Sequence, residues 1–285
     1  MAETGSETKP AAASAPRGTP DWASLGGIAV ALVGILGGML LENGKIKDIA
    51  QLTAALIVLG GTLGAVMVTT PMTVLLRAFR RSKDAFIQPA SRPDLIIEEI
   101  LTYATKARKN GIVALEKDAE AIADPFLRKA LNLAVDGTDL QELRNMMEIE
   151  MSLEEHEGES EAKVFEAAGG YSPTIGIIGA VLGLIQVMKE LANIEEVGRG
   201  IAGAFVATIY GVACANILFL PIANKLKARL HQRMSTHELM LEGVVGIIEG
   251  LNPKLIRVKL EAYSRDGGAA KKTADKKEKA SEKES

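Results

Sequence analysis

Four long stretches of this chain carry no charged side chain, and they limit its possible folds more than any other feature. They are Ser24–Leu41, Ile49–Leu76, Ala167–Met188 and Gly200–Asn224, with 18, 28, 22 and 25 residues. About 20 apolar residues cross the hydrocarbon core of a bilayer as a helix, so each stretch is long enough to span it. A buried soluble core could contain one such run, but four in one chain predict four transmembrane helices.

The composition fits a membrane protein that also has soluble parts. Hydrophobic residues make up 47% of the 285 residues, and the mean hydropathy is +0.14. The net charge of −3 provides no basic field for nucleic acid, so we expect no such partner. One cysteine, Cys214, excludes an intrachain disulfide and a cysteine-rich metal site, and the three histidines are scattered. We therefore expect no cofactor and no metal.

Basic residues near the span ends predict the orientation. After the second and fourth stretches the cations are Arg77, Arg80, Arg81 and Lys83, and Lys225, Lys227, Arg229 and Arg233. Such clusters mark cytoplasmic ends, so both termini and segment 77–166 are expected inside. Trp22 is expected to anchor the first span at the interface. The predicted fold class is an all-α membrane protein with a 2+2 span arrangement and a helical cytoplasmic domain between spans two and three.

Composition also divides the chain into parts. We expect a disordered tail over 1–22, spans one and two in 23–76, the cytoplasmic domain in 77–166, spans three and four in 167–224, a cytoplasmic helical extension in 225–265 and a charged disordered tail in 266–285. Apolar periodicity and capping signals predict helices over 93–110, 112–122, 125–135, 140–151 and 226–250. We interpret the acidic run 148–161 as a solvated stalk into the third span rather than a metal site.

The predicted spans contain no ionisable carboxylate or base. Their best-placed polar side chains are Thr174, Gln186, Thr208, Tyr210 and Asn216. Ion-coupled machines normally keep an ionisable or coordinating group within the membrane. Either the chain moves no ions, or a partner supplies the carboxylate.

Small residues and prolines give the spans a further pattern. Pairs of glycines four residues apart occur at Gly34 and Gly38, Gly60 and Gly64, and Gly179 and Gly183, which predicts close helix contacts. Pro173 and Pro221 lie toward the predicted cytoplasmic ends of spans three and four. Each proline alone is compatible with ordinary tolerance in membrane helices, but two at similar depth favour a hinge or kink.

The pattern resembles a known family, the A subunits of the bacterial flagellar stator (MotA/PomA). The resemblance rests on YSPTIGIIGAVLGLIQVM at 171–188, GAFVATIYGVACANILFLPIANKL at 203–226, ARKNGIVALEKDAE at 107–120 and GIIEGLNPKLIRVKLEAY at 246–263. It implies a multi-pass protein of the inner membrane that transports H⁺, or alternatively Na⁺, and is not an enzyme. It also implies five A subunits around two B subunits, each with a membrane aspartate and a peptidoglycan-binding domain, in contact with the rotor switch protein and membrane lipid.

The resemblance assigns roles to individual residues. Pro173 and Pro221 match the prolines implicated in coupling, Thr208 matches the threonine that faces the ion path, and Thr174 is expected to line it as well. Ala180 stands where sodium-type members tend to carry threonine, whose oxygen can help coordinate a hard cation, so we expect proton coupling.

Two charged residues of the cytoplasmic segment match the pair that contacts the rotor. They are Arg108 and Glu116. On an unbroken helix they would lie about 80° apart, and Gly111 between them makes that helix doubtful. Without the resemblance, a solvated helix surface explains both.

Two other functional classes remain for comparison. Energisers of the Tol and Exb systems, which transmit force to the outer membrane, share the motifs of spans three and four, but their large cytoplasmic segment follows the first span. A secondary transporter would need internal repeats and its own binding site, and neither is evident. No phosphate-binding loop, metal cluster or nucleophile arrangement indicates an enzyme.

Overall fold

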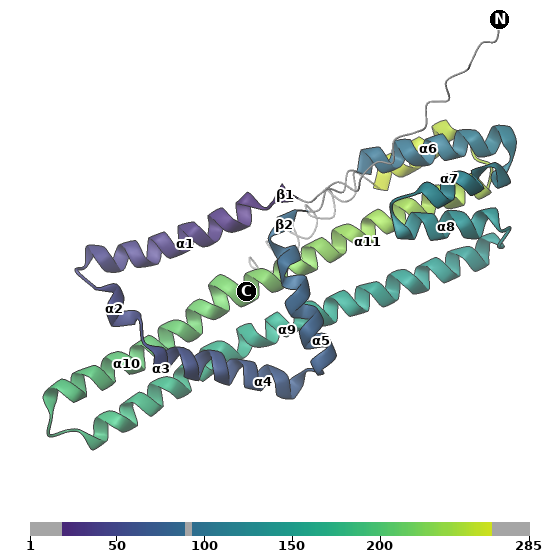
Figure 1. Ribbon diagram of the computed structural model, residues 1–285. Helices are drawn as coiled ribbons and strands as arrows, with labels where there is room; N and C mark the ends of the chain where they lie inside the picture. Colours follow the sequence, from purple (N-terminus) through teal and green to yellow (C-terminus); the bar gives the residue numbers. More distant parts are fainter. Residues whose placement is uncertain (1–18, 89–92, 264–285) are drawn as a thin grey trace, which may run out of the picture. The chain divides into compact units, whose positions relative to one another are not determined.

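The computed structural model describes residues 19–88 and 93–263, which are almost entirely helical (Figure 1). Within these ranges the only strands are β1 (Thr19–Pro20) and β2 (Ile87–Gln88), which pair antiparallel. The chain divides into two compact units. We call residues 19–88 with 154–231 the span unit, and residues 93–153 with 232–263 the bundle unit.

The span unit begins with one long apolar helix. In α1 (Trp22–Leu41) no residue is buried, and Asp21 caps its first turn by accepting the Ser24 N–H at 3.3 Å. Residues 19–22, expected in the N-terminal tail, are structured, whereas residues 1–18 and the tail expected over 266–285 lie outside the described residues. A four-residue helix, α2 (Ile46–Ile49), follows in the connection to the second span.

The second span is shorter than expected and is followed by a separate helix. It consists of α3 (Leu52–Ala55), the π-helical segment η1 (Leu56–Gly60) and α4 (Gly61–Thr69). The residue before a proline usually adopts an extended conformation. Thr70, which precedes Pro71, is extended, and the helix therefore ends at Thr69. The apolar run continues instead into α5 (Met72–Arg81), a 3₁₀ turn, η2 (Ser82–Ala85), and β2.

The third and fourth spans belong to very long helices. The third lies in α9 (Leu140–Lys189), and the fourth comprises α10 (Ile194–Ala213), the π-helical segment η4 (Cys214–Phe219) and the start of α11 (Leu220–Ile248). The short helix expected over 140–151 and the acidic stalk form one helix with the third span, because glutamate is a good helix former. All four expected spans are long and apolar enough to cross a membrane.

The bundle unit has a single apolar core. Its elements are α6 (Pro93–Asn110), the 3₁₀ turn η3 (Ile112–Leu115), α7 (Glu116–Ala121), α8 (Pro125–Val135), residues 140–153 of α9, residues 232–248 of α11 and helical residues 253–263. Helices α6 and α8 have the predicted bounds, whereas the single helix expected over 112–122 is divided into η3 and α7.

The C-terminal segment completes this core rather than forming a separate extension. Met240 and Val244 of α11, and Ile256 and Leu260 of the last helix, are fully buried in the same cluster as Ile100 of α6. Residues 77–88 and 154–166, expected in the cytoplasmic domain, belong instead to the span unit. Periodicity along the chain indicates that these faces are apolar, but it does not indicate which faces meet.

A buried carboxylate joins three helices of the bundle unit. Glu242 of α11 lies 2.9 Å from Arg144 of α9 and 2.6 Å from Lys259 of the last helix. Burial raises the pKa of this carboxyl, but the hydrogen bonds from Lys259 and Arg144 outweigh it, and the net pKa is lowered. Because its folded-state pKa is lowered, the group stabilises the unit above the ordinary glutamate pKa of about 4.3, and this contribution is lost as the pH falls through the folded-state value.

We predict that Glu242→Gln lowers the free energy of unfolding by about 2 kcal/mol at pH 7, because two cations lose their buried partner. Thermal unfolding of the purified protein in detergent at pH 7 and pH 4 measures this, and the difference from wild type should shrink at pH 4. Glu98→Gln, which removes an exposed pair with Arg257 at 2.7 Å, is the matched control and should have a smaller effect. Equal effects of the two substitutions would contradict the prediction.

Candidate functional site

Spans three and four touch through their backbones. A Cβ placed on Gly211 of α10 would lie 2.6 Å from the carbonyl oxygen of Ser172 in α9, and one on Gly176 would lie 2.9 Å from that of Ala207. Likewise, a Cβ on Gly183 would lie 3.2 Å from the backbone nitrogen and Cα of Ala204. Figure 1 shows these antiparallel segments side by side, joined by a short turn. Side chains at these glycines would push the helices apart.

The three glycine pairs of the sequence are not equivalent. Gly179 and Gly183 lie in the α9–α10 contact, where a Cβ on Gly179 would meet the methyl group of Ala207 at 2.9 Å. At Gly34 and Gly38 of α1, as at Gly60 and Gly64 of the second span, an added Cβ would meet no atom of this chain within 4 Å. Of the three pairs, the one in span three is therefore the pair that packs closely within the described chain.

Pro173 lies inside α9 without ending it. The helix runs unbroken through it, although proline cannot donate to the carbonyl group of Gly169 four residues earlier. Gly169 itself packs on the side chain of Leu220, where a Cβ would approach to 2.6 Å. Leu220 directly precedes Pro221, so both prolines lie next to the same helix contact.

Pro221 follows a π-helical segment. The wider turns of η4 end at Phe219, and Pro221 is the second residue of α11. π-Helical turns are rare and are frequently found at functional sites, and a proline adds a missing backbone donor. A locally widened helix therefore precedes Pro221, and the hinge or kink at the prolines stays a prediction. Proline was the available sequence signal, since the π-helical turn has no compositional signature.

The two threonines keep their hydroxyl groups within their own helices. Thr208 is half-buried and donates to the Ala204 carbonyl oxygen at 3.4 Å, while the exposed Thr174 donates to that of Tyr171 at 2.7 Å. A Cβ on Gly176 would lie 3.4 Å from the Cα of Thr208, so Thr208 lies opposite Gly176, two residues after Thr174. Ala180 is half-buried one turn further along α9. The site is a neutral wall with a few hydroxyl groups.

A cleft whose mainly apolar lining also contains polar and charged side chains lies at the other end of the same helices. It has a volume of about 590 Å³ and includes Gln51, Gln186, Glu190, Glu196 and Arg199 in its lining. A Cβ on Gly203 would lie 3.1 Å from the side-chain oxygen of Gln51. Tyr210 of α10 donates to the carbonyl oxygen of Ile49, the last residue of α2, at 2.6 Å. Of these residues, the sequence had indicated only Gln186 and Tyr210.

The predicted rotor-contact residues lie in the bundle unit on separate elements. Arg108 is in the last turn of α6 and Glu116 begins α7. Gly111 between them has a φ of 81°, a left-handed conformation that glycine adopts at helix ends, so the single helix is excluded. Both side chains are exposed, and neither is ion-paired among the described residues.

Arg108 also borders an apolar hollow of about 390 Å³, which Ile112, Ile247 and Leu251 help to line. In the described part of the chain, no group of three or more His, Cys, Asp or Glu residues could hold a metal ion.

Comparison with known proteins gives matches along most of the chain. The profile of the MotA/TolQ/ExbB proton channel family matches residues 118–239, and the profile "Motility protein A N-terminal" matches residues 25–111. Motility protein A of Bacillus subtilis (strain 168) is 36% identical over 247 residues, which cover 85% of this chain and 90% of that protein. Chemotaxis protein PomA of Vibrio alginolyticus is 31% identical over 245 residues, which cover 84% of this chain and 96% of that protein.

Two solved structures resemble this chain in both fold and sequence. The structure of C. jejuni MotAB matches with a TM-score of 0.82 at 31% identity and covers 85% of this chain and 95% of that one. The flagellar MotAB stator complex of Bacillus subtilis matches with a TM-score of 0.78 at 35% identity, again over 85% of this chain and 95% of that one.

The packing of spans three and four leads to a prediction about Gly211. We expect Gly211→Ala to destabilise the protein by about 1–3 kcal/mol, because the methyl group would clash with a backbone carbonyl that cannot rotate away. Membrane abundance and thermal unfolding of the purified protein measure this effect. Gly64→Ala, where the new methyl group has space in this chain, is the control. Wild-type stability of the Gly211 variant would show that the two helices are not in close contact.

Proposed function

The chain belongs to the motility protein A family of flagellar stator subunits, within the MotA/TolQ/ExbB proton channel family, and we propose that it works with a B subunit to convert ion flow into rotation of the flagellar rotor. It is a stator proton-channel subunit and a multi-pass protein of the inner membrane. The observation that carries this function is the close packing of spans three and four, which contain Pro173 and Thr208 and carry no charged side chain over 167–188 and 200–224. Its family consists of ion-channel subunits, and we propose no enzymatic activity.

A B subunit would supply what the spans lack. The structural relatives are MotAB complexes, and a neutral wall needs an ionisable group from elsewhere to bind a proton. We propose that each B subunit contributes one membrane helix with an aspartate and a domain that binds peptidoglycan. Exposed apolar side chains on α9 and α10, such as Ile177, Val181 and Phe205, support lateral contacts with other helices and with lipid. Five A subunits around two B subunits is the proposed assembly.

In this mechanism, protonation controls the fit between the partner aspartate and the wall. A charged aspartate attracts the few hydroxyl groups, those of Thr208 and Thr174, whereas a neutral one packs against the apolar surface. The resulting change would bend the wall most easily at Pro173 and Pro221, where a backbone hydrogen bond is missing. Repeated binding and release would step the A ring around the anchored B dimer.

Torque would reach the rotor through the bundle unit. Arg108 and Glu116 are exposed and not neutralised within the described chain, so they remain available to a partner of complementary charge. The basic residues after α4 and at the start of α11 favour a cytoplasmic location for this unit and for both termini. The partner would then be the rotor switch protein.

The Tol/Exb alternative has less support. Two apolar helices, α1 and the second span, precede the bundle unit, and residues 25–111 match the motility protein A N-terminal profile. A force-transmitting energiser remains the second hypothesis because of the similarity in spans three and four.

We predict that cells without this gene have intact filaments but do not swim, and that wild type restores swimming while Thr208→Ala restores it poorly. The reason is that Thr208 contributes one of the few oxygens along the proposed ion path. Swimming speed and filament staining provide the measurements, and membrane abundance of the variant controls for folding. Normal swimming with a leaky envelope in the deletion strain would favour the Tol/Exb function instead.

We also predict proton rather than sodium coupling. Ala180 offers a methyl group where an oxygen would help to coordinate a sodium ion, and a proton needs only the aspartate and a water path. Swimming speed should stay constant when potassium replaces sodium at fixed pH and ionic strength. A speed that collapses without sodium would overturn the assignment.

A further inference from the structure

Asp21 is a buried carboxylate at the start of the first span. Only 6% of the residue is exposed, and it lies immediately before a helix with no buried residue of its own. Its backbone N–H donates to the Phe86 carbonyl oxygen at 2.9 Å, beside the β1–β2 pairing. The sequence suggested only a disordered tail here, so this residue was not a candidate for function.

Two cations of α11 hold the carboxylate. The same oxygen of Asp21, Oδ2, lies 2.5 Å from Lys225 Nζ and 3.0 Å from Arg229 Nη2. Arg229 also donates to the Ala85 carbonyl oxygen at 3.4 Å. The hydrogen bond from Lys225 holds the pKa of Asp21 well below its usual range, so the carboxylate is charged throughout the physiological pH range. Asp21 therefore does not act as a pH switch in this range.

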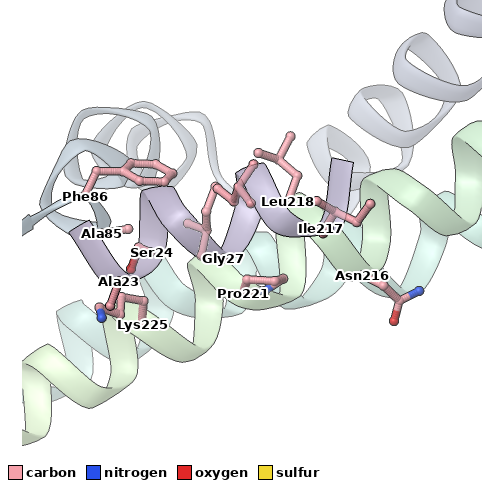
Figure 2. A pocket seen from close by; sticks show the side chains of 13 residues that line it. Ala23, Ser24, Gly27, Ala85, Phe86, Asn216, Ile217, Leu218, Pro221 and Lys225 are labelled. Carbon is pink, nitrogen blue, oxygen red and sulfur yellow. The ribbon is translucent and has the colours of Figure 1, made fainter. Parts of the chain in front are cut away.

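These cations share a helix face with Pro221. Residues 221, 225 and 229 are spaced four apart, which places them along one side of α11. Figure 2 shows Pro221 and Lys225 on the side of α11 that faces Ala23, Ser24 and Gly27 of α1. A cleft of about 370 Å³ separates the two helices beyond Lys225. Among the described residues, the buried Asp21 thus attaches the start of α1 to α11, close to Pro221.

We propose that Asp21 is a positioning residue that fixes the N-terminal end of α1 to the side of α11 that carries Pro221, Lys225 and Arg229. It thereby sets how far the helix around Pro221 can bend during the ion cycle. This inference rests on the proposed stator function. The π-helical turns of η4 and the donor missing at Pro221 leave that part of the helix weakly restrained by its own backbone. The ion pairs of Asp21 restrain it from outside the helix.

The effect of removing the carboxylate follows from its burial. Neutralising one partner of a buried ion pair leaves the other charge without compensation, and here Arg229 is the more buried cation, with 13% of its side chain exposed. Asp21→Asn keeps the size and the helix cap but removes the charge. Asp21→Glu keeps the charge and tests whether the exact length of the side chain matters.

The test measures torque per stator unit and the number of units separately. Full-length variants are expressed with the B subunit in a strain that lacks its own stators. A bead attached to a flagellum reports the rotation speed of the motor, and the height of each speed step, as one stator unit joins, gives the torque per unit. Fluorescent fusions count the units. We expect Asp21→Asn to lower the step height about twofold or more while units still assemble, and Asp21→Glu to recover most of it. Glu159→Gln, which removes an exposed pair with Lys163 at 3.4 Å, should behave as wild type.

A second variant keeps the test informative if the Asp21→Asn protein does not accumulate in the membrane. Lys225→Gln leaves the pair of Asp21 with Arg229 in place, so the fold should persist and the step height should fall by a smaller amount. Wild-type step height in both variants, or fewer units of normal step height, would overturn the positioning role. If wild type itself gives no rotation in this strain, the proposed stator function fails, which is a separate outcome.

Discussion

The backbone contact between α9 and α10 is the constraint on which the rest of the span unit depends. In a bilayer, apolar surface gains little by leaving lipid for another helix, so helices associate through close packing. Gly176, Gly183 and Gly211 allow that approach, because any side chain there would meet a backbone atom. The second span adds to the pair where Ile175 of α9 packs against Gly61.

This packing also explains why the candidate site is neutral. A charge between two helices at backbone distance would be buried without space for water or a partner, which is costly in a low-dielectric environment. Several of the polar groups that remain donate within their own helices, as with Thr208 to Ala204 and Asn216 to Val212. Such groups can line a path without binding an ion strongly, so affinity and charge must be supplied by another chain.

The sequence predicted some levels of this structure well and others poorly. The positions of the spans follow from local composition, and α6 and α8 follow from periodicity and caps, so both could be predicted. Contacts between distant segments could not: the last helix enters the bundle core through Ile256 and Leu260, and Asp21 meets residues more than two hundred positions away. The span pattern singled out Pro173, Thr208 and Pro221, and the resemblance assigned their roles, but their surroundings became evident only in three dimensions.

The cations that predict the orientation have a second role in the folded chain. In the span unit five of them are paired with acids from other elements: Arg77 with Glu157 and Glu161, Arg81 with Glu161, Lys227 with Glu166, and Lys225 and Arg229 with Asp21. Orientation depends on lysine and arginine while acids contribute little, so these pairs need not weaken the signal during insertion. In the folded chain the same side chains connect separate elements of the span unit. One set of residues can thus direct topology first and restrain the helices next to Pro173 and Pro221 afterwards.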